Sequence, residues 1–265
     1  MPDEAYLANF YSNYHVGEGE EGNYANESKM RRKHPVQVEL VMKHTALRPG
    51  RLLDIGCGKG YFLKECADAG IECAGIELSD TAVRFARSSL GLDVIPGRLD
   101  QLGAPPVGAE TKALSYSLYG GAGQFDTATM WGVIEHLRDP IRMLRATANV
   151  LKPGGKLFVQ TGIGDDWLDR LLPGVNQWYD PPQHLFVFSA NGMKRSAERT
   201  GFRLEHLDTW YDISRRRRYV RAIRNGVAAC LLRGVAEVCR LPRPAFQMTK
   251  FPLGLSMIAV MTKLS

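Results

Sequence analysis

The chain has 265 residues, of which 45% are hydrophobic, so it can bury the core of one elaborated domain and is not a disordered polypeptide. Its formal net charge of +6 is carried by six arginines between residues 215 and 224, and the rest is neutral. No run of about 18 apolar residues and no signal peptide is visible, so we expect a cytoplasmic protein. The five cysteines show no C-x-x-C pair or metal-ligand spacing, and we expect reduced thiols and no metal site.

The first part of the chain differs from the rest in composition. Residues 1–35 are polar and tyrosine-rich, and we predict a cap or lid that is partly helical near residues 4–11. Residues 36–265 are predicted to form one domain, which begins with a helix at residues 35–46. Exchange of the tyrosine-rich segment between protomers would give a homo-oligomer, and the oligomeric state stays open.

Strands and helices then alternate along the chain. Such an order predicts an α/β fold with a doubly wound, mostly parallel sheet. Ligands of these sheets bind beyond the carboxyl ends of the strands, where Asp54, Glu77 and Trp131 are expected. Strands are predicted at residues 51–55, 71–76, 92–95, 125–131, 156–161, 203–210 and 255–263, and helices at residues 60–69, 79–89, 140–151 and 190–200.

A glycine turn follows the first strand. Residues 54–61 have the sequence D-I-G-C-G-K-G-Y, and the acid Glu77 comes nineteen residues after the glycine at position 58. A glycine turn that opens a helix, followed by an acid at the tip of the next strand, is typical of a nucleotide site. Tyr61 occupies the place of the third glycine of a dinucleotide-binding turn, and no phosphate-binding P-loop is present. The pattern therefore favours another nucleoside ligand over a dinucleotide.

Four segments together resemble the motifs of class I S-adenosylmethionine-dependent methyltransferases, in the same order. They are residues 52–63, 124–137 and 151–159, and the sequence P-P-Q-H-L-F-V-F-S at residues 181–189. The last segment resembles one bacterial branch that acts mostly on small molecules and on sugar-like or lipid-like metabolites. The resemblance implies a Rossmann-like sheet of seven strands whose last strand is antiparallel beside the sixth.

The resemblance covers residues 36 to about 210 and returns at the last strand. In the family a short hairpin joins the last two strands, whereas about 45 residues intervene here. We predict that residues 212–250 form a basic, helical insertion that holds the arginine cluster.

The resemblance implies S-adenosylmethionine as the cofactor and S-adenosylhomocysteine as its product. Asp54 would receive the cofactor's ammonium group, Glu77 the ribose hydroxyls, and Leu78 would line the adenine. The family's Gly-Asp pair after the third strand is Gly-Arg here, and Arg98 cannot accept a hydrogen bond from adenine, so Asp100 or backbone groups would take that role. The implied cofactor contacts are Asp54, Gly56, Cys57, Gly58, Gly60, Tyr61, Glu77, Leu78, Leu99, Asp100, Trp131 and Gly132.

Two histidines are candidates for the base that removes a proton from an acceptor hydroxyl. Imidazole titrates near neutral pH and suits this task. His184 lies where the family places acceptor-binding elements, and it could instead anchor the turn at residues 181–182. His136 follows the fourth strand, and it could instead hold the loop over the cofactor.

The arginine cluster has three open interpretations. It could be a solvent-exposed helix end, a site for a phosphate-bearing acceptor or nucleic acid, or a peripheral membrane contact. The membrane contact would use the segment from Arg215 to Leu241, in which an apolar stretch follows the arginines. Nucleic acid is the least favoured partner, because the basic segment is short and no binding module is recognisable.

We therefore predict a methyltransferase that acts on a small-molecule acceptor, with oxygen favoured over nitrogen and carbon. The alternatives are an RNA methyltransferase and a catalytically inactive binding protein. A nicotinamide dehydrogenase is disfavoured by Tyr61 and by the L-K-P-G-G sequence at residues 151–155.

Overall fold

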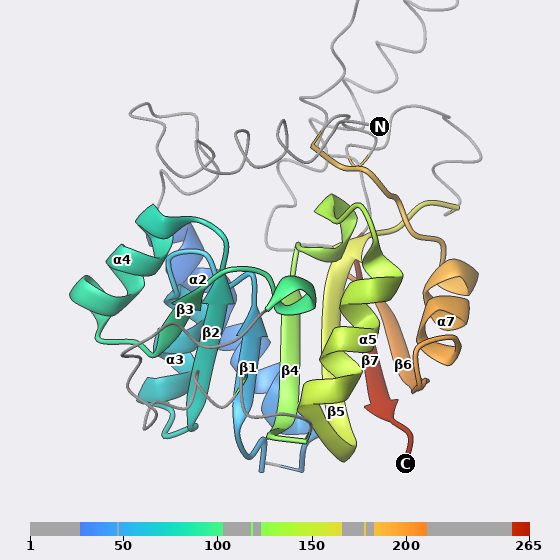
Figure 1. The fold of residues 1–265 in the computed structure, drawn as a ribbon, viewed down its shortest axis with the longest axis horizontal. Coiled ribbons are helices and arrows are strands. Elements are labelled where there is room, and N and C mark those ends of the chain that lie inside the picture. Colours follow the sequence, from blue (N-terminus) through green and yellow to red (C-terminus); the bar gives the residue numbers. More distant parts are fainter. Residues whose placement is uncertain are drawn as a thin grey trace, which may run out of the picture.

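The protein is built around one twisted sheet, which Figure 1 shows from its face. The structure, a computed structural model, describes residues 27–46, 48–102, 118, 123–165, 178, 183–210 and 256–265. The strands are β1 (Leu52–Ile55), β2 (Cys73–Glu77), β3 (Val94–Pro96), β4 (Phe125–Trp131), β5 (Leu151–Gly162), β6 (Phe202–Trp210) and β7 (Ser256–Lys263). The helices are α2 (Glu27–His44), α3 (Tyr61–Asp68), α4 (Asp80–Leu90), α5 (Pro140–Val150) and α7 (Ala190–Glu198), with short 3-10 turns η1 (Leu99–Gln101) and η3 (Ile134–His136).

The strand order confirms the predicted doubly wound sheet. In the described residues seven strands follow the order β3-β2-β1-β4-β5-β7-β6. The first five strands pair in parallel, and β7 lies between β5 and β6, antiparallel to both. The order reverses between β1 and β4, so this is the switch point at which ligands of such sheets bind.

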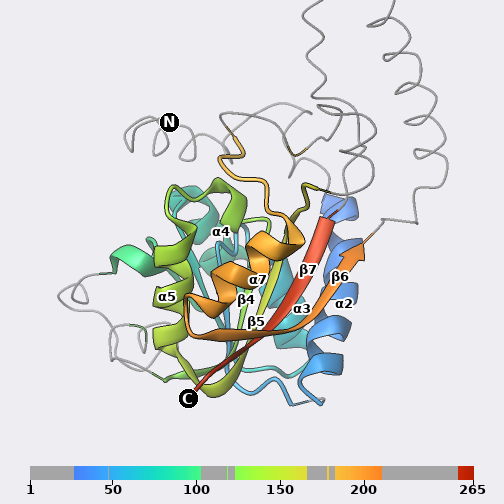
Figure 2. The ribbon, with the colours of Figure 1, turned by 90° about the vertical axis from the view of Figure 1, so that its right-hand side faces the viewer.

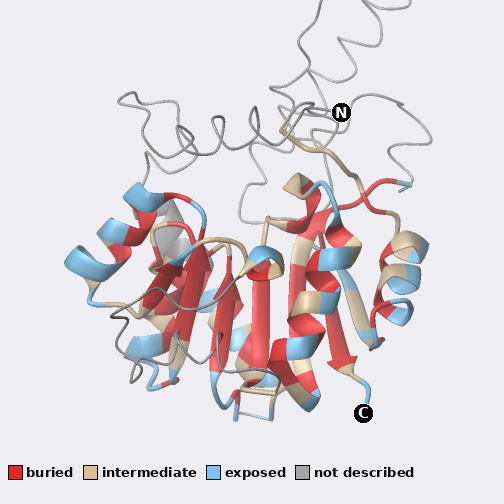
Figure 3. Ribbon diagram, in the orientation of Figure 1, coloured by how far each residue is buried: buried red, intermediate tan, exposed pale blue. Residues whose placement is uncertain are grey.

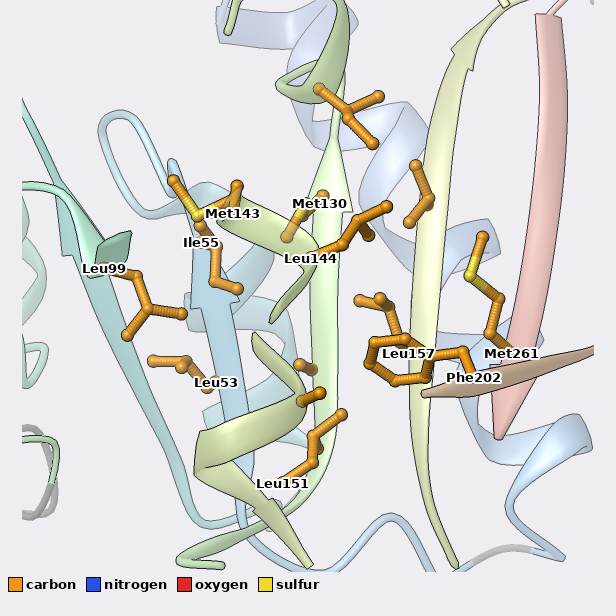
Figure 4. Packing of buried hydrophobic residues seen from close by; sticks show 14 of the residues in the cluster. Leu53, Ile55, Leu99, Met130, Met143, Leu144, Leu151, Leu157, Phe202 and Met261 are labelled. Atoms are coloured by element: carbon orange, nitrogen blue, oxygen red, sulfur yellow. The ribbon is translucent and has the colours of Figure 1, made fainter. Parts of the chain in front are cut away.

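Both faces of the sheet are covered by helices. One apolar layer joins α5 and α7 to alternate residues of the strands, as the packing of Leu53, Ile55, Leu144 and Leu157 shows (Figure 4). The other layer joins α2, α3 and α4 to residues that point the opposite way, such as Phe158. In the view of Figure 2 the sheet lies between α2 and α7. The inner strands β1, β2, β4, β5 and β7 are mostly buried (Figure 3), which explains why they are largely apolar in the sequence.

The starts of α4 and α5 are set by local side-chain hydrogen bonds. Ser79 accepts a hydrogen bond from the Ala82 amide at 3.4 Å and begins α4. Asp139 accepts one from the Arg142 amide at 2.9 Å and begins α5. These caps replace backbone partners that the first turn of a helix lacks. Both helices therefore begin at the carboxyl edge of the sheet.

Two elements begin earlier than the sequence indicates. The helix predicted from residue 35 starts at Glu27 and contains Pro35, because one lost backbone hydrogen bond does not end a helix whose later residues pack on the core, as the buried Val41 does. Strand β5 begins at Leu151, which pairs with Phe125 before a register shift. The glycine-containing turn at residues 153–155 is therefore an irregularity within β5.

Some predictions concern residues outside those that the structure describes. They are residues 1–26 of the cap predicted at residues 1–35, and the basic insertion with the segment from Arg215 to Leu241. The boundary between cap and domain stays a prediction. Within the described ranges, every helix is too short or too polar to cross a bilayer.

The start of α3 depends on a left-handed glycine that is closely packed. Gly60 has φ +81°, and a Cβ added to it would lie 2.6 Å from Leu92 Cδ1 and 3.2 Å from Ala86 Cβ. Gly70 has a similar φ of +76° but open space around it. A side chain at Gly70 would cause backbone strain alone, whereas a side chain at Gly60 would cause backbone strain and crowding.

We expect Gly60→Ala to lower the free energy of unfolding by about 2–4 kcal/mol, from backbone strain plus overpacking. Gly70→Ala is the matched control and should lower it by about 1–2 kcal/mol, from backbone strain alone. Urea unfolding without cofactor measures both. An equal loss in the two variants would show that Leu92 and Ala86 yield without cost.

Candidate functional site

The predicted site residues come together at the carboxyl edge of the sheet. Asp54 lies in β1 beside Thr129 of β4, and Glu77 ends β2. The glycine turn between β1 and α3 joins them, since the Gly56 amide donates to the Ile76 carbonyl at 2.8 Å. The edge therefore combines an acid from each of two neighbouring strands with a run of backbone amides.

Glu77 is held by the backbone on both sides of its carboxylate. Its Oε2 accepts a hydrogen bond from the Gly58 amide at 2.9 Å, and its Oε1 accepts one from the Ser79 amide at 2.8 Å. The residue is 8% exposed. A carboxylate has about four acceptor positions, so two remain for ligand hydroxyls. This geometry is suited to the ribose contact that the resemblance implies.

Asp54 is almost completely buried. It is 2% exposed, and the Thr129 hydroxyl donates a hydrogen bond of 2.6 Å to its Oδ1. Burial and, to a smaller extent, the Glu77 carboxylate raise the pKa of Asp54 to about 7, although the Thr129 hydrogen bond acts in the opposite direction. A cation placed beside Asp54 would stabilise its charged form. The cofactor's ammonium group meets this requirement.

The backbone of the glycine turn is closely packed against the segment after β4. Gly56 has φ +70°, and a Cβ there would lie 2.7 Å from the Val133 side chain. Cys57 is buried beside this turn, and burial raises the pKa of its thiol, so the thiol is not a nucleophile at neutral pH. The turn and the start of η3 therefore form one packed unit.

Apolar side chains flank the two acids. Leu78 is 43% exposed, although most large apolar side chains of the described residues are buried. Trp131 at the end of β4 packs against Phe62 with ring centroids 5.3 Å apart, and its indole nitrogen is buried without a hydrogen-bond partner among the described residues. Tyr61 packs edge-on against Phe85. These positions fit the adenine and cofactor contacts that the resemblance implies for Leu78, Trp131 and Tyr61.

The two residues after β3 that are predicted to contact adenine, Leu99 and Asp100, lie in different surroundings. Leu99 is 6% exposed and belongs to the apolar layer under α5. Asp100 is bound by Arg98 through two hydrogen bonds of 3.1 and 3.0 Å, and Arg142 lies 3.8 Å away. Arg98, which the sequence marks as a departure from the family, thus orients the acid two residues later. The adenine contact stays a prediction.

His136 and His184 lie next to each other although 48 positions separate them. Their ring centroids are 4.9 Å apart. The Glu135 carbonyl accepts hydrogen bonds from the amides of Leu185 at 2.8 Å and Phe186 at 3.2 Å, which fixes the second segment against η3. Burial lowers the pKa of His136, and its hydrogen bond to the Gln183 carbonyl acts in the opposite direction.

Glu135 is a site residue that the sequence did not single out. It is 1% exposed and lies beside both histidines, with one potential ligand atom of each of the three residues within 4.8 Å of the others. Burial raises the pKa of its carboxyl to about 7, and the nearby Thr161 hydroxyl acts in the opposite direction without completing a hydrogen bond of normal geometry. In the sequence, Glu135 is marked only by its place next to His136 after a strand. That pattern does not reveal that its carboxyl group is buried.

The residues at this edge fit S-adenosylmethionine. Glu77 has acceptor positions beyond its two amide contacts, Asp54 is a buried acid that a cation would stabilise, and Leu78 offers an exposed apolar surface. The glycine residues at 56, 58, 60 and 132 all have positive φ, which shapes the turns around these groups. The donor and acceptor set therefore matches an amino acid joined to a nucleoside.

A family model described as a methyltransferase domain matches residues 29–207, which is more than half of the chain. The chain belongs to this methyltransferase family. The resemblance found in the sequence is thereby confirmed, and S-adenosylmethionine is the cofactor that the family supports. The P-P-Q-H-L-F-V-F-S branch assignment stays a prediction.

Relatives in Xanthomonas are named ubiquinone biosynthesis O-methyltransferase. The protein of Xanthomonas euvesicatoria pv. vesicatoria is 31% identical over 163 residues, which are 55% of this chain and 62% of the relative. The protein of Xanthomonas oryzae pv. oryzae has the same identity and coverage. The aligned part is thus less than two thirds of these relatives' length.

Solved structures share the fold. Magnesium protoporphyrin IX methyltransferase from Synechocystis PCC 6803, solved with bound S-adenosylhomocysteine, has a TM-score of 0.58 and 12% identity over 98% of this chain and all (100%) of its own. The cyclase SpnF has a TM-score of 0.56 and 23% identity over 86% of this chain and 80% of its own. A cyclase among the neighbours illustrates that the fold alone does not decide the reaction.

We expect Asp54→Asn to stabilise the protein without cofactor, increasingly as the pH rises from 5 to 8. The folded protein holds the Asp54 proton up to a pKa of about 7, whereas the unfolded chain releases it near a pKa of about 3.9. Wild-type stability therefore falls across this window, and asparagine avoids that fall. Melting temperatures across the pH range measure the difference, and the same variant should bind S-adenosylmethionine more weakly.

The matched control is Asp126→Asn at the opposite end of β4. The Arg51 amide and the Lys152 ammonium hold the carboxylate of Asp126 through hydrogen bonds of 2.9 and 2.7 Å, and the pKa of this acid is lowered. This variant should be less stable than wild type at pH 7. A pH-independent stability difference for Asp54→Asn would contradict the assignment of a raised pKa.

Proposed function

We propose that this methyltransferase transfers the methyl group of S-adenosylmethionine to an oxygen atom of a small molecule. The observation that carries the proposal is the proximity of two imidazoles, His136 and His184, beside the cofactor edge. A hydroxyl acceptor must lose a proton, and neutral imidazole is the side chain best suited to take it near pH 7. An aliphatic carbon acceptor would need a stronger base.

The protein residues bind, orient and exclude water. When bound, the cofactor supplies a methyl group on a positively charged sulfur. Asp54 would hold the ammonium group, Glu77 the ribose, and the amides of the glycine turn the carboxylate, near the start of α3. Fixing the donor in this way aligns it with the acceptor, which is the main contribution that such a transfer needs from the protein.

The name of the Xanthomonas relatives supports an oxygen acceptor and points toward a lipid-like class. The aligned part covers only 62% of those relatives, so their acceptor need not be the acceptor of this chain. Sugar-like and secondary metabolites therefore stay in the proposed acceptor class. A lipid-like acceptor would agree with the predicted membrane contact of the segment from Arg215 to Leu241, which lies outside the described residues.

Transfer of labelled methyl from S-adenosylmethionine into an extract of the source organism tests the acceptor class. The extract would be divided into lipid, small aqueous and RNA fractions. We expect label in the lipid or small aqueous fraction, and none with Glu77→Ala, which loses the ribose contact. Glu72→Ala, at an exposed position just before β2, is the matched control and should label as wild type does. Label in RNA alone would overturn the proposal.

We expect His184→Ala to lower kcat at least about 100-fold while the Kd for S-adenosylmethionine changes less than about threefold, since general bases contribute about 10²–10⁴ in rate. Steady-state kinetics with the identified acceptor and calorimetric cofactor titration measure the two effects. His206→Ala, whose imidazole contacts Asp208 on β6, is the control and should leave both values unchanged. Unchanged turnover in His184→Ala would remove this residue from the reaction.

A further inference from the structure

We propose that Glu135, His136 and His184 bind one divalent transition-metal ion, best represented by zinc, and that this ion holds the acceptor oxygen. The second half of this inference rests on the proposed oxygen methylation, whereas the first half stands on the geometry alone. Each of the three residues offers a ligand atom within 4.8 Å of the other two. In a tetrahedral zinc site with bond lengths of about 2.0–2.2 Å, the ligand atoms lie about 3.4 Å from one another. Side-chain rotations that move these atoms by about 1 Å would therefore complete the site.

The Glu135 carboxylate is the first reason to place a cation here. The residue is 1% exposed, and both of its carboxyl oxygens are buried without a hydrogen-bond partner in the part of the chain that the structure describes. An ionised carboxylate in such surroundings is costly unless it is paired or coordinates a metal.

The outer hydrogen bonds of both imidazoles are the second reason. His136 Nδ1 lies 2.7 Å from the Gln183 carbonyl, and His184 Nδ1 lies 3.1 Å from the Trp178 carbonyl. A carbonyl oxygen only accepts, so each Nδ1 must donate, and the lone pair of the neutral ring is then on Nε2. Histidines that bind metals almost always donate their other nitrogen to a carbonyl or carboxylate in this way.

The backbone around the three residues is fixed. The two hydrogen bonds that the Glu135 carbonyl accepts from Leu185 and Phe186 join η3 to the segment that carries His184. That segment is also paired with the end of β5, through the bridge between Ile163 and Phe188. The ligands therefore come from two segments with a common rigid support, as a metal site requires.

The ligand set decides between kinds of ion. Two imidazoles and one carboxylate are typical of catalytic zinc, with a fourth position open, whereas magnesium and calcium prefer oxygen ligands only. An open position next to the cofactor edge fits an acceptor hydroxyl. Gly132, a predicted cofactor contact, lies close to the Glu135 carboxylate, since a Cβ added to this glycine would be 3.6 Å from Glu135 Oε1. The proposed metal ion would therefore lie near the cofactor.

With the Nε2 lone pairs of both histidines on the ion, the ion would replace the free imidazoles in activating the acceptor: it would lower the pKa of the acceptor hydroxyl, whose proton passes to water. The acceptor oxygen then attacks the methyl carbon, an oxygen–carbon bond forms, and the carbon–sulfur bond breaks. Its electron pair remains on sulfur, so the products are the methyl ether, S-adenosylhomocysteine and one proton.

The test is zinc binding by the full chain after removal of metals with a chelator. Equilibrium dialysis against zinc chloride, followed by elemental analysis, should give one zinc per chain with a micromolar or lower Kd. Glu135→Gln and His184→Ala should each weaken binding at least about 100-fold. Circular dichroism and S-adenosylmethionine titration show that each variant is folded, and the second variant keeps the test decisive if the first does not fold.

His206→Ala is the matched control. His206 lies beside His44, with ring centroids 5.0 Å apart, and contacts Asp208, so this variant also removes the other imidazole pair next to an acid. It should bind zinc as wild type does. Cobalt substitution should give a spectrum without the strong thiolate absorption, which separates the proposed site from the cysteines. A thiolate spectrum, or zinc binding that is lost in His206→Ala, would overturn the proposal.

Metal removal also separates this inference from the proposed function. The chelated protein should keep its affinity for S-adenosylmethionine and lose methyl transfer at least about 100-fold, with recovery on addition of zinc. Methyl transfer that proceeds without bound metal would overturn the metal's role while leaving oxygen methylation intact. If the wild-type protein binds zinc no more tightly than Glu135→Gln does, the proposed metal site is wrong.

Discussion

The hydrogen bond from the Gly58 amide to the Glu77 carboxylate holds the candidate site together. It joins the glycine turn after β1 to the tip of β2, across nineteen positions of the chain. A buried carboxylate needs donors, and here the amides of Gly58 and Ser79 supply them. The same contact therefore orients the acid for a ligand, shapes the turn and leads the chain into α3. Neither part of the site could keep its geometry without the other.

Charge balance is the second constraint on this edge of the sheet. Asp54, Glu77 and Glu135 are all less than 9% exposed, and burial raises the pKa of the first and last to about 7. Buried acids at one edge repel each other unless cations lie between them. A cofactor with an ammonium group and a positively charged sulfur suits this negative potential. The proposed metal ion would balance the negative charge of Glu135.

The packing of the loops connects the two halves of the site. Val133 fills the space above Gly56, and the next turn carries Glu135 and His136. The predicted cofactor side and the proposed acceptor side thus share one short segment after β4.

The sequence by itself determined the features that depend on local chemistry. Periodicity predicted the order of strands and helices, and the spacing of the glycine turn from Glu77 predicted a nucleoside site at the carboxyl edge of the sheet. Each of these signals lies within about twenty residues, over which backbone geometry and hydrogen bonding leave few alternatives.

Only the tertiary structure decided the features that join distant segments. It brings His184 to Glu135 and His136 through backbone hydrogen bonds after β5, and it brings Arg142 of α5 to the carbonyl of Asp100. It also continues α2 through Pro35, because contact with the core outweighs a local stop signal. Burial is the physical reason, since the partners of a carboxylate or imidazole are set by the whole packed sheet and not by its neighbours in the chain.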